Sequence, residues 1–200
     1  MCIRDREELV KDGKIRTYGV SNYNPEQFID LIKTIDENDY KNFSCIESHY
    51  NLIERMIEEA LLPLVEQSKI SLIPYRSLAR GVLSGKYLGG LIPDKSRAED
   101  SWRVRNSLTA EVDFLVKSLS EEVAKKYGKT ILELSIAWLL RKKSVPTVLI
   151  GCRNIKQLSQ CIDASNWMLT NEASQDIEIL IDRLGSRDHV QNSPRVYFEQ

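Results

Sequence analysis

The sequence predicts an α/β fold with a parallel sheet, and two observations carry this prediction. Short runs rich in branched apolar residues alternate with longer segments that have helical periodicity and capping signals. Such alternation is typical of parallel sheets with right-handed crossovers. Four strand–helix units can be traced in the 200 residues, which fits half of an eight-unit barrel or a small open sheet. The strands are expected at 14–20, 44–47, 70–75 and 145–150.

The first unit follows the end of a helix. Residues 7–12 have a helical pattern, and Gly13 is placed to stop this helix. After the first strand, Asn24 is expected to cap a helix whose first position is Pro25. Another helix is expected from about 54 to 67, because its apolar residues share one face.

A long excursion separates the third and fourth units. Residues 88–107 are too long for an ordinary connection, so they are expected to form a lid or a clamp over a ligand. An amphipathic helix at 109–127 follows, and a capping box of Thr130 and Glu133 opens the next helix. Two more helices are expected after the fourth strand, and Thr170 caps the last one.

Length and charge are those of one ordinary globular domain, with 200 residues and a net charge of −1. This charge gives no reason to expect a nucleic-acid partner. No apolar run approaches the roughly 20 residues of a membrane span, and no secretory signal is present, so a cytoplasmic protein is expected. The four cysteines show neither paired nor metal-ligand spacing, which predicts reduced thiols and no metal site.

The two ends of the chain are expected to differ from the rest. Residues 1–6 resemble the in-frame translation of a common transposase sequencing adapter, which predicts a scar outside the fold. On that interpretation the folded part covers 7–185 and is a C-terminal fragment of a longer protein. Residues 186–200 are polar and are expected to form a mobile tail.

The stretch from 70 to 87 carries the clearest chemical signal. Its strand leads into a loop with small residues, a hydroxyl, two arginines, a lysine and two glycines. Small residues let backbone N–H groups approach an anion, and cations balance its charge. Ligands of parallel α/β folds bind at the carboxyl ends of strands, where this loop is placed. An anion-binding loop is predicted, and the alternative is a basic surface loop.

Five segments resemble motifs of the aldo-keto reductase family, in the family's own order. They lie at 13–22 (GKIR and GVSN), 49–55 (HYNLIER), 75–87, 136–140 (IAWLL) and 150–158. The resemblance implies a TIM (β/α)8 barrel, of which this chain would hold strands 5–8 as a partial barrel. It also implies an NADP(H)-dependent oxidoreductase that reduces aldehydes and ketones to alcohols by hydride transfer.

The resemblance also implies which residues hold the nicotinamide. Ser21 and Asn22 match the residues that bind its carboxamide, and Tyr75 matches the ring that stacks on it. An alternative for Tyr75 is a core tyrosine at a strand end. Glu47 stands where the family usually has Gln. A carboxylate only accepts hydrogen bonds, so Glu47 can take the carboxamide NH2 but cannot donate to its oxygen.

The phosphates and the adenine would lie on two loops and the excursion. The residues that match the pyrophosphate loop are Arg76, Ser77, Leu78, Ala79, Arg80 and Lys86, with Arg76 in place of the commoner Ser. Arg97 matches a clamp arginine, and its alternative is a solvated surface charge. The residues that match the 2′-phosphate and adenine site are Gly151, Arg153, Asn154, Gln157 and Gln160, the last where the family prefers Glu. A guanidinium suits a phosphate dianion, and a helix N-terminus adds its dipole.

No catalytic residue is assigned to this chain. In the family, the acid–base residues lie on the first four strands, which have no match here. The fragment is therefore expected to bind NADP(H) without catalysis, and the small carbonyl substrate belongs to the parent protein. The alternatives are a non-catalytic NADP(H)-binding subunit, like the cytoplasmic subunits of potassium channels, and a small α/β protein with another role. Half a barrel exposes strand edges and an apolar face, so self-association is expected.

Overall fold

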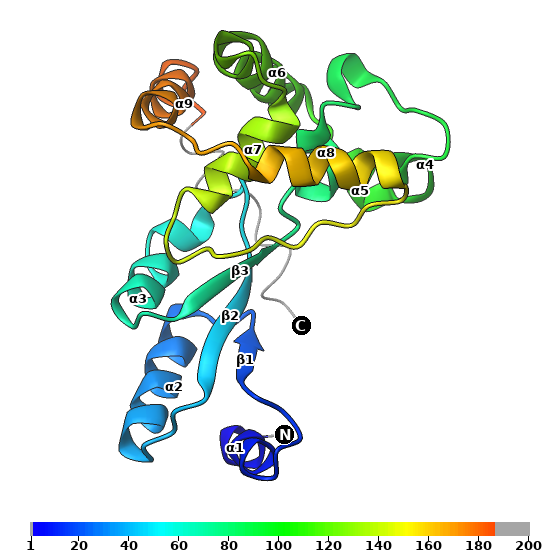
Figure 1. Cartoon of the computed structure of the whole chain (residues 1–200). Helices are drawn as coiled ribbons and strands as arrows, with labels where there is room; N and C mark the ends of the chain where they lie inside the picture. The colour runs from blue at the N-terminus through cyan, green and yellow to red at the C-terminus, as the bar shows by residue number, and fades with distance from the viewer. Residues whose placement is uncertain (1, 187–200) are drawn as a thin grey trace.

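The computed structural model describes residues 2–186 and shows a parallel sheet (Figure 1). Within these residues the sheet has three strands in the order β1-β2-β3. Both strand pairs are parallel, which confirms the predicted α/β fold with a parallel sheet, while the partial barrel stays a prediction. The strands are β1 (Tyr18–Ser21), β2 (Phe43–His49) and β3 (Ser71–Tyr75), and the crossover helices are α2 (Pro25–Glu37) and α3 (Leu61–Gln67).

Capping side chains start the helices where the sequence predicts them. The Asn24 side chain accepts a hydrogen bond from the Gln27 amide at 2.8 Å, within a capping box that opens α2. Thr130 and Thr170 accept in the same way from residues three positions later. The helices that these threonines and Asn154 open are α7 (Ile131–Leu140), α9 (Asn171–Arg183) and α8 (Ile155–Ser165).

The first strand is shorter than predicted because residues after helix α1 (Ile3–Lys11) bond to the end of that helix. The predicted strand began at residue 14, but the amides of Lys14 and Ile15 donate to the Leu9 carbonyl at 2.9 and 3.4 Å and so complete the end of α1. These residues therefore cannot begin the ladder, which starts at Tyr18. Residues 3–6 form the first turn of α1. Their predicted origin as a scar stays a prediction.

Proline divides the helix that was predicted at 54–67. The structure has a 3-10 turn, η1 (Met56–Glu58), and then α3. Pro63 lies in the first turn of α3, where its missing N–H leaves no hydrogen bond unmade. In one continuous helix, Pro63 would interrupt the interior of the ladder.

The predicted fourth strand at 145–150 does not form. Two backbone hydrogen bonds do join this part of the chain to β3, from the Leu72 amide to Ser144 O at 2.6 Å and from the Leu149 amide to Pro74 O at 3.0 Å. Between them, Pro74 and Pro146 have no N–H to donate. The segment thus runs beside β3 without a regular ladder.

The excursion holds short helical pieces, and the amphipathic helix that follows it is confirmed. The excursion contains η3 (Leu88–Gly90), α4 (Arg97–Asp100) and α5 (Trp102–Asn106), while η2 (Ala79–Ser84) precedes it. The amphipathic helix begins as α6 (Ala110–Ser118) and continues through a π-helical turn, η4 (Leu119–Ala124), and η5 (Lys125–Tyr127). Gly128 ends it with a left-handed φ of +66°.

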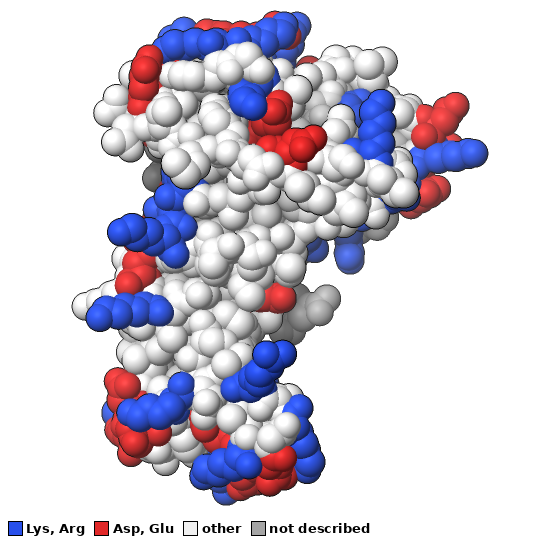
Figure 2. Space-filling model, viewed as in Figure 1, with Lys and Arg blue, Asp and Glu red and all other residues white. Residues whose placement is uncertain are grey.

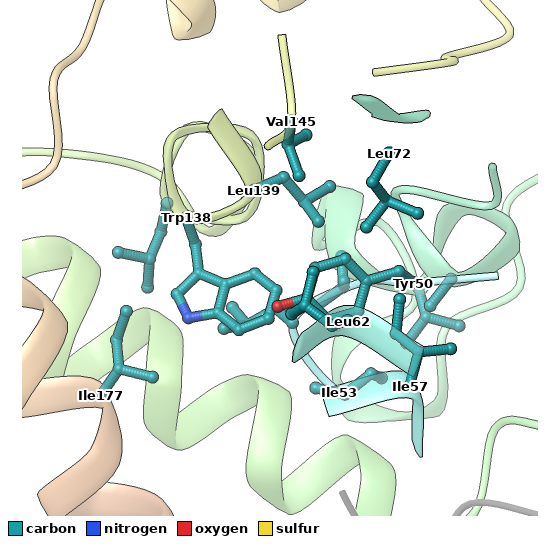
Figure 3. Packing of buried hydrophobic residues seen from close by; sticks show 14 of the residues in the cluster. Tyr50, Ile53, Ile57, Leu62, Leu72, Trp138, Leu139, Val145 and Ile177 are labelled. Atoms are coloured by element: carbon teal, nitrogen blue, oxygen red, sulfur yellow. The ribbon is translucent and has the colours of Figure 1, made fainter. Parts of the chain in front are cut away.

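A buried cluster fixes α7 against the ends of the strands (Figure 3). Trp138 of α7 packs on Tyr50, with ring centroids 5.1 Å apart. The guanidinium groups of Arg55 and Arg141 lie 4.4 and 3.9 Å from the Trp138 ring. Arg55 also donates to Glu178 at 2.7 Å, which ties α9 to the same cluster. The loops that follow β2 and β3 are therefore next to a buried, well-packed cluster.

The two faces of the sheet differ in exposure. Alternate strand residues such as Val20, Ile46 and Leu72 are buried. The register pairs on the other face, including Ser21 with Glu47 and His49 with Tyr75, are half-buried or exposed. Helices α2 and α3 lie along one face of the sheet (Figure 1). The predicted tail, except Ser186, lies outside the described residues. No helix within residues 2–186 is long and apolar enough to cross a membrane.

Candidate functional site

A cavity of about 190 Å³ opens at the carboxyl end of β3. It lies between the loop after β3, the segment at 149–157 and α4. Nine predicted site residues line it: Arg76, Ser77, Leu78, Arg80, Lys86, Arg97, Gly151, Arg153 and Gln157. Its other lining residues, which were not predicted to bind the cofactor, are Gly81, Leu149 and Ile150. Within the described residues, this lining contains five cationic side chains and no carboxylate.

The loop after β3 has an unusual backbone. Arg76, Ala79 and Arg80 have left-handed φ angles of 53°, 46° and 57°, which side chains other than glycine rarely adopt. The amides of Ala79 and Gly81 each donate at 2.7 Å to a carbonyl of the same loop. The buried Ser77 hydroxyl lies 3.1 Å from Pro74 O and 3.0 Å from Leu149 O. Packing and hydrogen bonds therefore hold a conformation that the local sequence disfavours.

Gly81 lets Lys86 lie against this loop. Gly81 has a φ of +101°, and a Cβ placed there would meet the Lys86 Cε and Nζ atoms at 3.2 Å. The Lys86 ammonium also lies 4.9 Å from the centre of the Tyr87 ring. Because the Lys86 atoms are the flexible end of a long side chain, the positive φ is the main reason for glycine at this position.

The cationic side chains in and near the cavity lower one another's pKa values. Burial is the main cause that lowers the pKa of Arg76 and of Arg80, and the charge of Arg80 lowers the pKa of Arg76 further. Arg103 of α5, which was not among the predicted site residues, also lowers the pKa of both arginines. Figure 2 shows basic and acidic side chains interspersed at the end of the molecule that α4 and α5 form. The lining of the cavity itself is cationic, which favours an anionic ligand.

Glu54 joins the loops after β2 and β3, and it was not among the predicted site residues. Its Oε2 atom accepts hydrogen bonds from His49 at 2.7 Å and from Asn51 at 2.6 Å, and its Oε1 lies 4.0 Å from the Arg80 guanidinium. Asn51 also donates to Arg76 O at 3.1 Å. Burial opposes the charged form, but the bonds from His49 and Asn51 outweigh it and lower the pKa of Glu54. The HYNLIER motif contained this residue.

Four predicted residues lie at neighbouring strand ends. The Tyr75 hydroxyl donates to the side-chain Oδ1 of Asn22 at 2.7 Å. The backbone amide of Asn22 donates to the backbone oxygen of Glu47 at 2.9 Å. Ser21 pairs with Glu47 in the sheet. The Tyr75 ring stacks on His49, with centroids 5.6 Å apart. Burial raises the pKa of Tyr75, so its phenol remains protonated and able to donate.

The remaining predicted residues lie outside the cavity lining. Ala79 is buried within its loop, and Asn154 caps α8 by accepting from the Gln157 amide at 2.9 Å. Gln160 lies on an exposed part of α8.

Arg153, which lines the cavity, makes two further contacts. Its backbone amide donates to Gln157 Oε1 at 2.9 Å and its guanidinium donates to Lys95 O, so the excursion contacts the loop before α8.

The chain is similar to known reductases and dehydrogenases. Aldo-keto reductase YhdN from Bacillus subtilis is 30% identical over 88% of this chain and 52% of its own length. The NADH-specific methylglyoxal reductase of Escherichia coli is 26% identical over 82% of this chain and 48% of its own length. The structure of a glycerol dehydrogenase from Gluconobacter oxydans is similar with a TM-score of 0.74 and 28% identity, over 98% of this chain and 57% of that one.

These comparisons agree with the observed architecture. The chain spans about half the length of the curated relatives it matches. The structural similarity and the family together imply an α/β TIM barrel fold. The model of the aldo/keto reductase family matches residues 3–182, which is most of the sequence. The chain therefore belongs to the aldo/keto reductase family.

Proposed function

We propose that this chain supplies the NADP(H)-binding half of a reductase that converts aldehydes and ketones to alcohols. The observation that carries the proposal is the cavity with five cationic side chains and no acidic one among the described residues. In this proposal the sheet and the 145–150 segment correspond to strands 5–8 of a (β/α)8 barrel. The cavity then lies at the carboxyl ends of the strands, where barrel enzymes bind their ligands.

The cavity fits the phosphates of this cofactor in charge. NADP(H) carries a pyrophosphate and a separate 2′-phosphate, and anions of this kind are bound by cations and backbone amides together. Arg76, Arg80 and Lys86 would hold the pyrophosphate from the loop after β3. Arg153 lies on the other side of the cavity, next to the N-terminus of α8, and would hold the 2′-phosphate.

The strand ends would orient the nicotinamide. When bound, NADPH supplies the hydride that the carbonyl carbon accepts. Ser21 and Asn22 offer hydrogen-bonding groups at the end of β1, and Tyr75 offers a ring whose hydroxyl is held by Asn22. Fixing the nicotinamide in this way selects the face from which hydride leaves. Glu47 would accept a hydrogen bond from the carboxamide NH2.

Cofactor preference gives the sharpest test, since one relative is NADH-specific by name. Dissociation constants for NADPH and NADH are measured by tryptophan fluorescence for the wild type and three variants. A hydrogen bond to a charged group contributes about 1.5–3 kcal/mol, so Arg153→Ala should weaken NADPH binding roughly 10- to 150-fold and leave NADH binding nearly unchanged. Arg80→Ala should weaken both cofactors, because both have the pyrophosphate.

Arg16→Ala is the matched control. Arg16 is exposed before β1, at the opposite end of the strands, so both dissociation constants should stay at their wild-type values. Equal losses for NADPH and NADH in Arg153→Ala would remove Arg153 from the 2′-phosphate site. A wild-type chain that binds neither cofactor would overturn the proposal.

The proposal assigns cofactor binding to this chain and no proton transfer. Purified chain mixed with NADPH and a reactive aldehyde should therefore oxidise NADPH no faster than the protein-free background. The absorbance of NADPH at its near-ultraviolet maximum reports the rate. Turnover above background that disappears in Tyr75→Ala would show that a proton donor is present in these residues, against the proposal.

A further inference from the structure

Two cysteines that no short sequence motif connects, Cys152 and Cys161, lie close together in the fold. Cys152 precedes α8, and Cys161 lies within it. Their sulfur atoms are 3.9 Å apart, and all four cysteines are free thiols. Both side chains are half-buried, so a small reagent can reach them while a bulky one is hindered. No short paired motif contains these cysteines, so their spacing predicted isolated reduced thiols.

The surrounding backbone allows these sulfurs to approach further. A disulfide has an S–S length near 2.05 Å, so the sulfurs need to close by roughly 2 Å. Cys152 is in a loop, next to the exposed Gly151, and no atom lies within 4 Å of the position that a Gly151 Cβ would take. The backbone at Gly151 therefore has no close neighbour on that side, whereas Cys161 lies within helix α8.

We propose that Cys152 and Cys161 form an oxidisable dithiol whose disulfide draws the loop before α8 away from the cavity and weakens its grip on phosphate. The dithiol itself rests on the sulfur geometry alone. Its effect on ligand binding also rests on the proposed NADP(H) function. The oxidant is a peroxide of the size of hydrogen peroxide.

The chemistry balances with one peroxide for each disulfide. Burial, together with the Cys152 thiol, raises the pKa of Cys161, which disfavours the Cys161 thiolate as the attacking group. The Cys152 sulfur attacks one peroxide oxygen and the O–O bond breaks, giving a sulfenic acid and water. The Cys161 sulfur then forms the S–S bond while the S–O bond breaks and a second water leaves. Two thiols lose two electrons, and both thiol protons end in water.

Arg153 connects a movement of Cys152 to the phosphate-binding cavity. It follows Cys152 directly, lines the cavity and contacts both Gln157 and Lys95. A displacement on the order of 2 Å exceeds the tolerance of a charge-assisted hydrogen bond. Oxidation should therefore weaken NADPH binding roughly tenfold or more and change NADH binding much less, since NADH has no 2′-phosphate.

Peptide mapping tests the dithiol without any cofactor. Trypsin separates the two cysteines into peptides 144–153 and 157–183, each of which contains no other cysteine. After hydrogen peroxide treatment, non-reducing mass spectrometry should find these peptides joined, with two hydrogens fewer than their sum. Cys161→Ser should abolish the joined product. Cys45→Ser, the control on β2, should leave it unchanged.

Binding then tests the consequence. NADPH and NADH dissociation constants are compared for the reduced and the peroxide-treated chain, in wild type and Cys161→Ser. Loss of NADPH affinity in wild type alone, restored by dithiothreitol, supports the proposal. Sulfinic acids without a joined peptide would overturn the dithiol. A joined peptide with unchanged NADPH affinity would overturn its effect on the cavity. A reduced chain that binds no NADPH would overturn the proposed function and leave the mapped disulfide standing.

Discussion

The two loops that face each other across the cavity differ in how firmly they are held. In the loop after β3, Ser77 and Leu83 are 1% and 0% exposed, and Glu54 and Asn51 hold it from the side. In the loop before α8, Leu149 is 44% exposed, and Arg153 lies on the surface. One loop is part of the core, and the other is a surface segment joined to it at few points.

This difference separates two tasks. The buried loop keeps several residues in left-handed conformations that cost about 1–3 kcal/mol each, and only a well-packed surrounding can hold them. In return, its cations are fixed before any ligand arrives. The surface loop can shift at little cost. A group that must be held in one place is thus presented by the buried loop, and a contact that can be regulated is presented by the surface loop.

Removing core contacts should affect the buried loop most. Leu83→Ala deletes a fully buried side chain and should lower the free energy of unfolding by about 2–5 kcal/mol. Leu149→Ala removes the same atoms from a largely exposed position and should change it by about 0.5 kcal/mol. Urea denaturation at one protein concentration measures both. Similar losses in the two variants would mean that the loops are held alike.

Removing the charge of Glu54 should have the next largest effect, and one that depends on pH. The folded pKa of Glu54 is lowered, so this carboxylate stabilises the fold above its unfolded pKa, near 4.5, and the stabilisation is lost as the pH falls towards the folded value. Glu54→Gln should lower the free energy of unfolding by about 1.5–3 kcal/mol at pH 7.

The same variant should lose stability less steeply than the wild type when the pH is lowered below 5. Other carboxyls, Glu7 among them, also have lowered pKa values, so the difference between the two proteins isolates Glu54. Denaturation curves collected from pH 7 to pH 3 give this difference. A constant difference across that range would mean that Glu54 is not a stabilising carboxylate.

The smallest effect is expected at the link between the loops. Ser77→Ala removes the hydroxyl that contacts both Pro74 O and Leu149 O and should cost about 1 kcal/mol. Amide hydrogen exchange should become faster at 149–153 in this variant. Ser84→Ala, which removes a bond within the buried loop only, should leave exchange at 149–153 unchanged. Faster exchange in both variants would deny Ser77 a linking role.

Much of the site follows from the sequence because its parts are local. Helix starts depend on hydrogen bonds between residues three positions apart, so the capping roles of Asn24, Thr130 and Thr170 can be predicted from the sequence alone. The basic loop after β3 was identifiable from its residue types and its place after a buried strand. Nine of the sixteen residues predicted to bind the cofactor line the cavity.

What the sequence did not show depends on contacts between distant segments. A strand exists only if its partner offers hydrogen bonds, and the prolines on both sides of the β3 edge prevent a regular ladder at 145–150. Glu54 joins two loops because the parallel sheet places their ends side by side. Cys152 and Cys161 meet because the chain turns into α8 between them. Local patterns specify the elements, and only packing decides which side chains from separate elements come into contact.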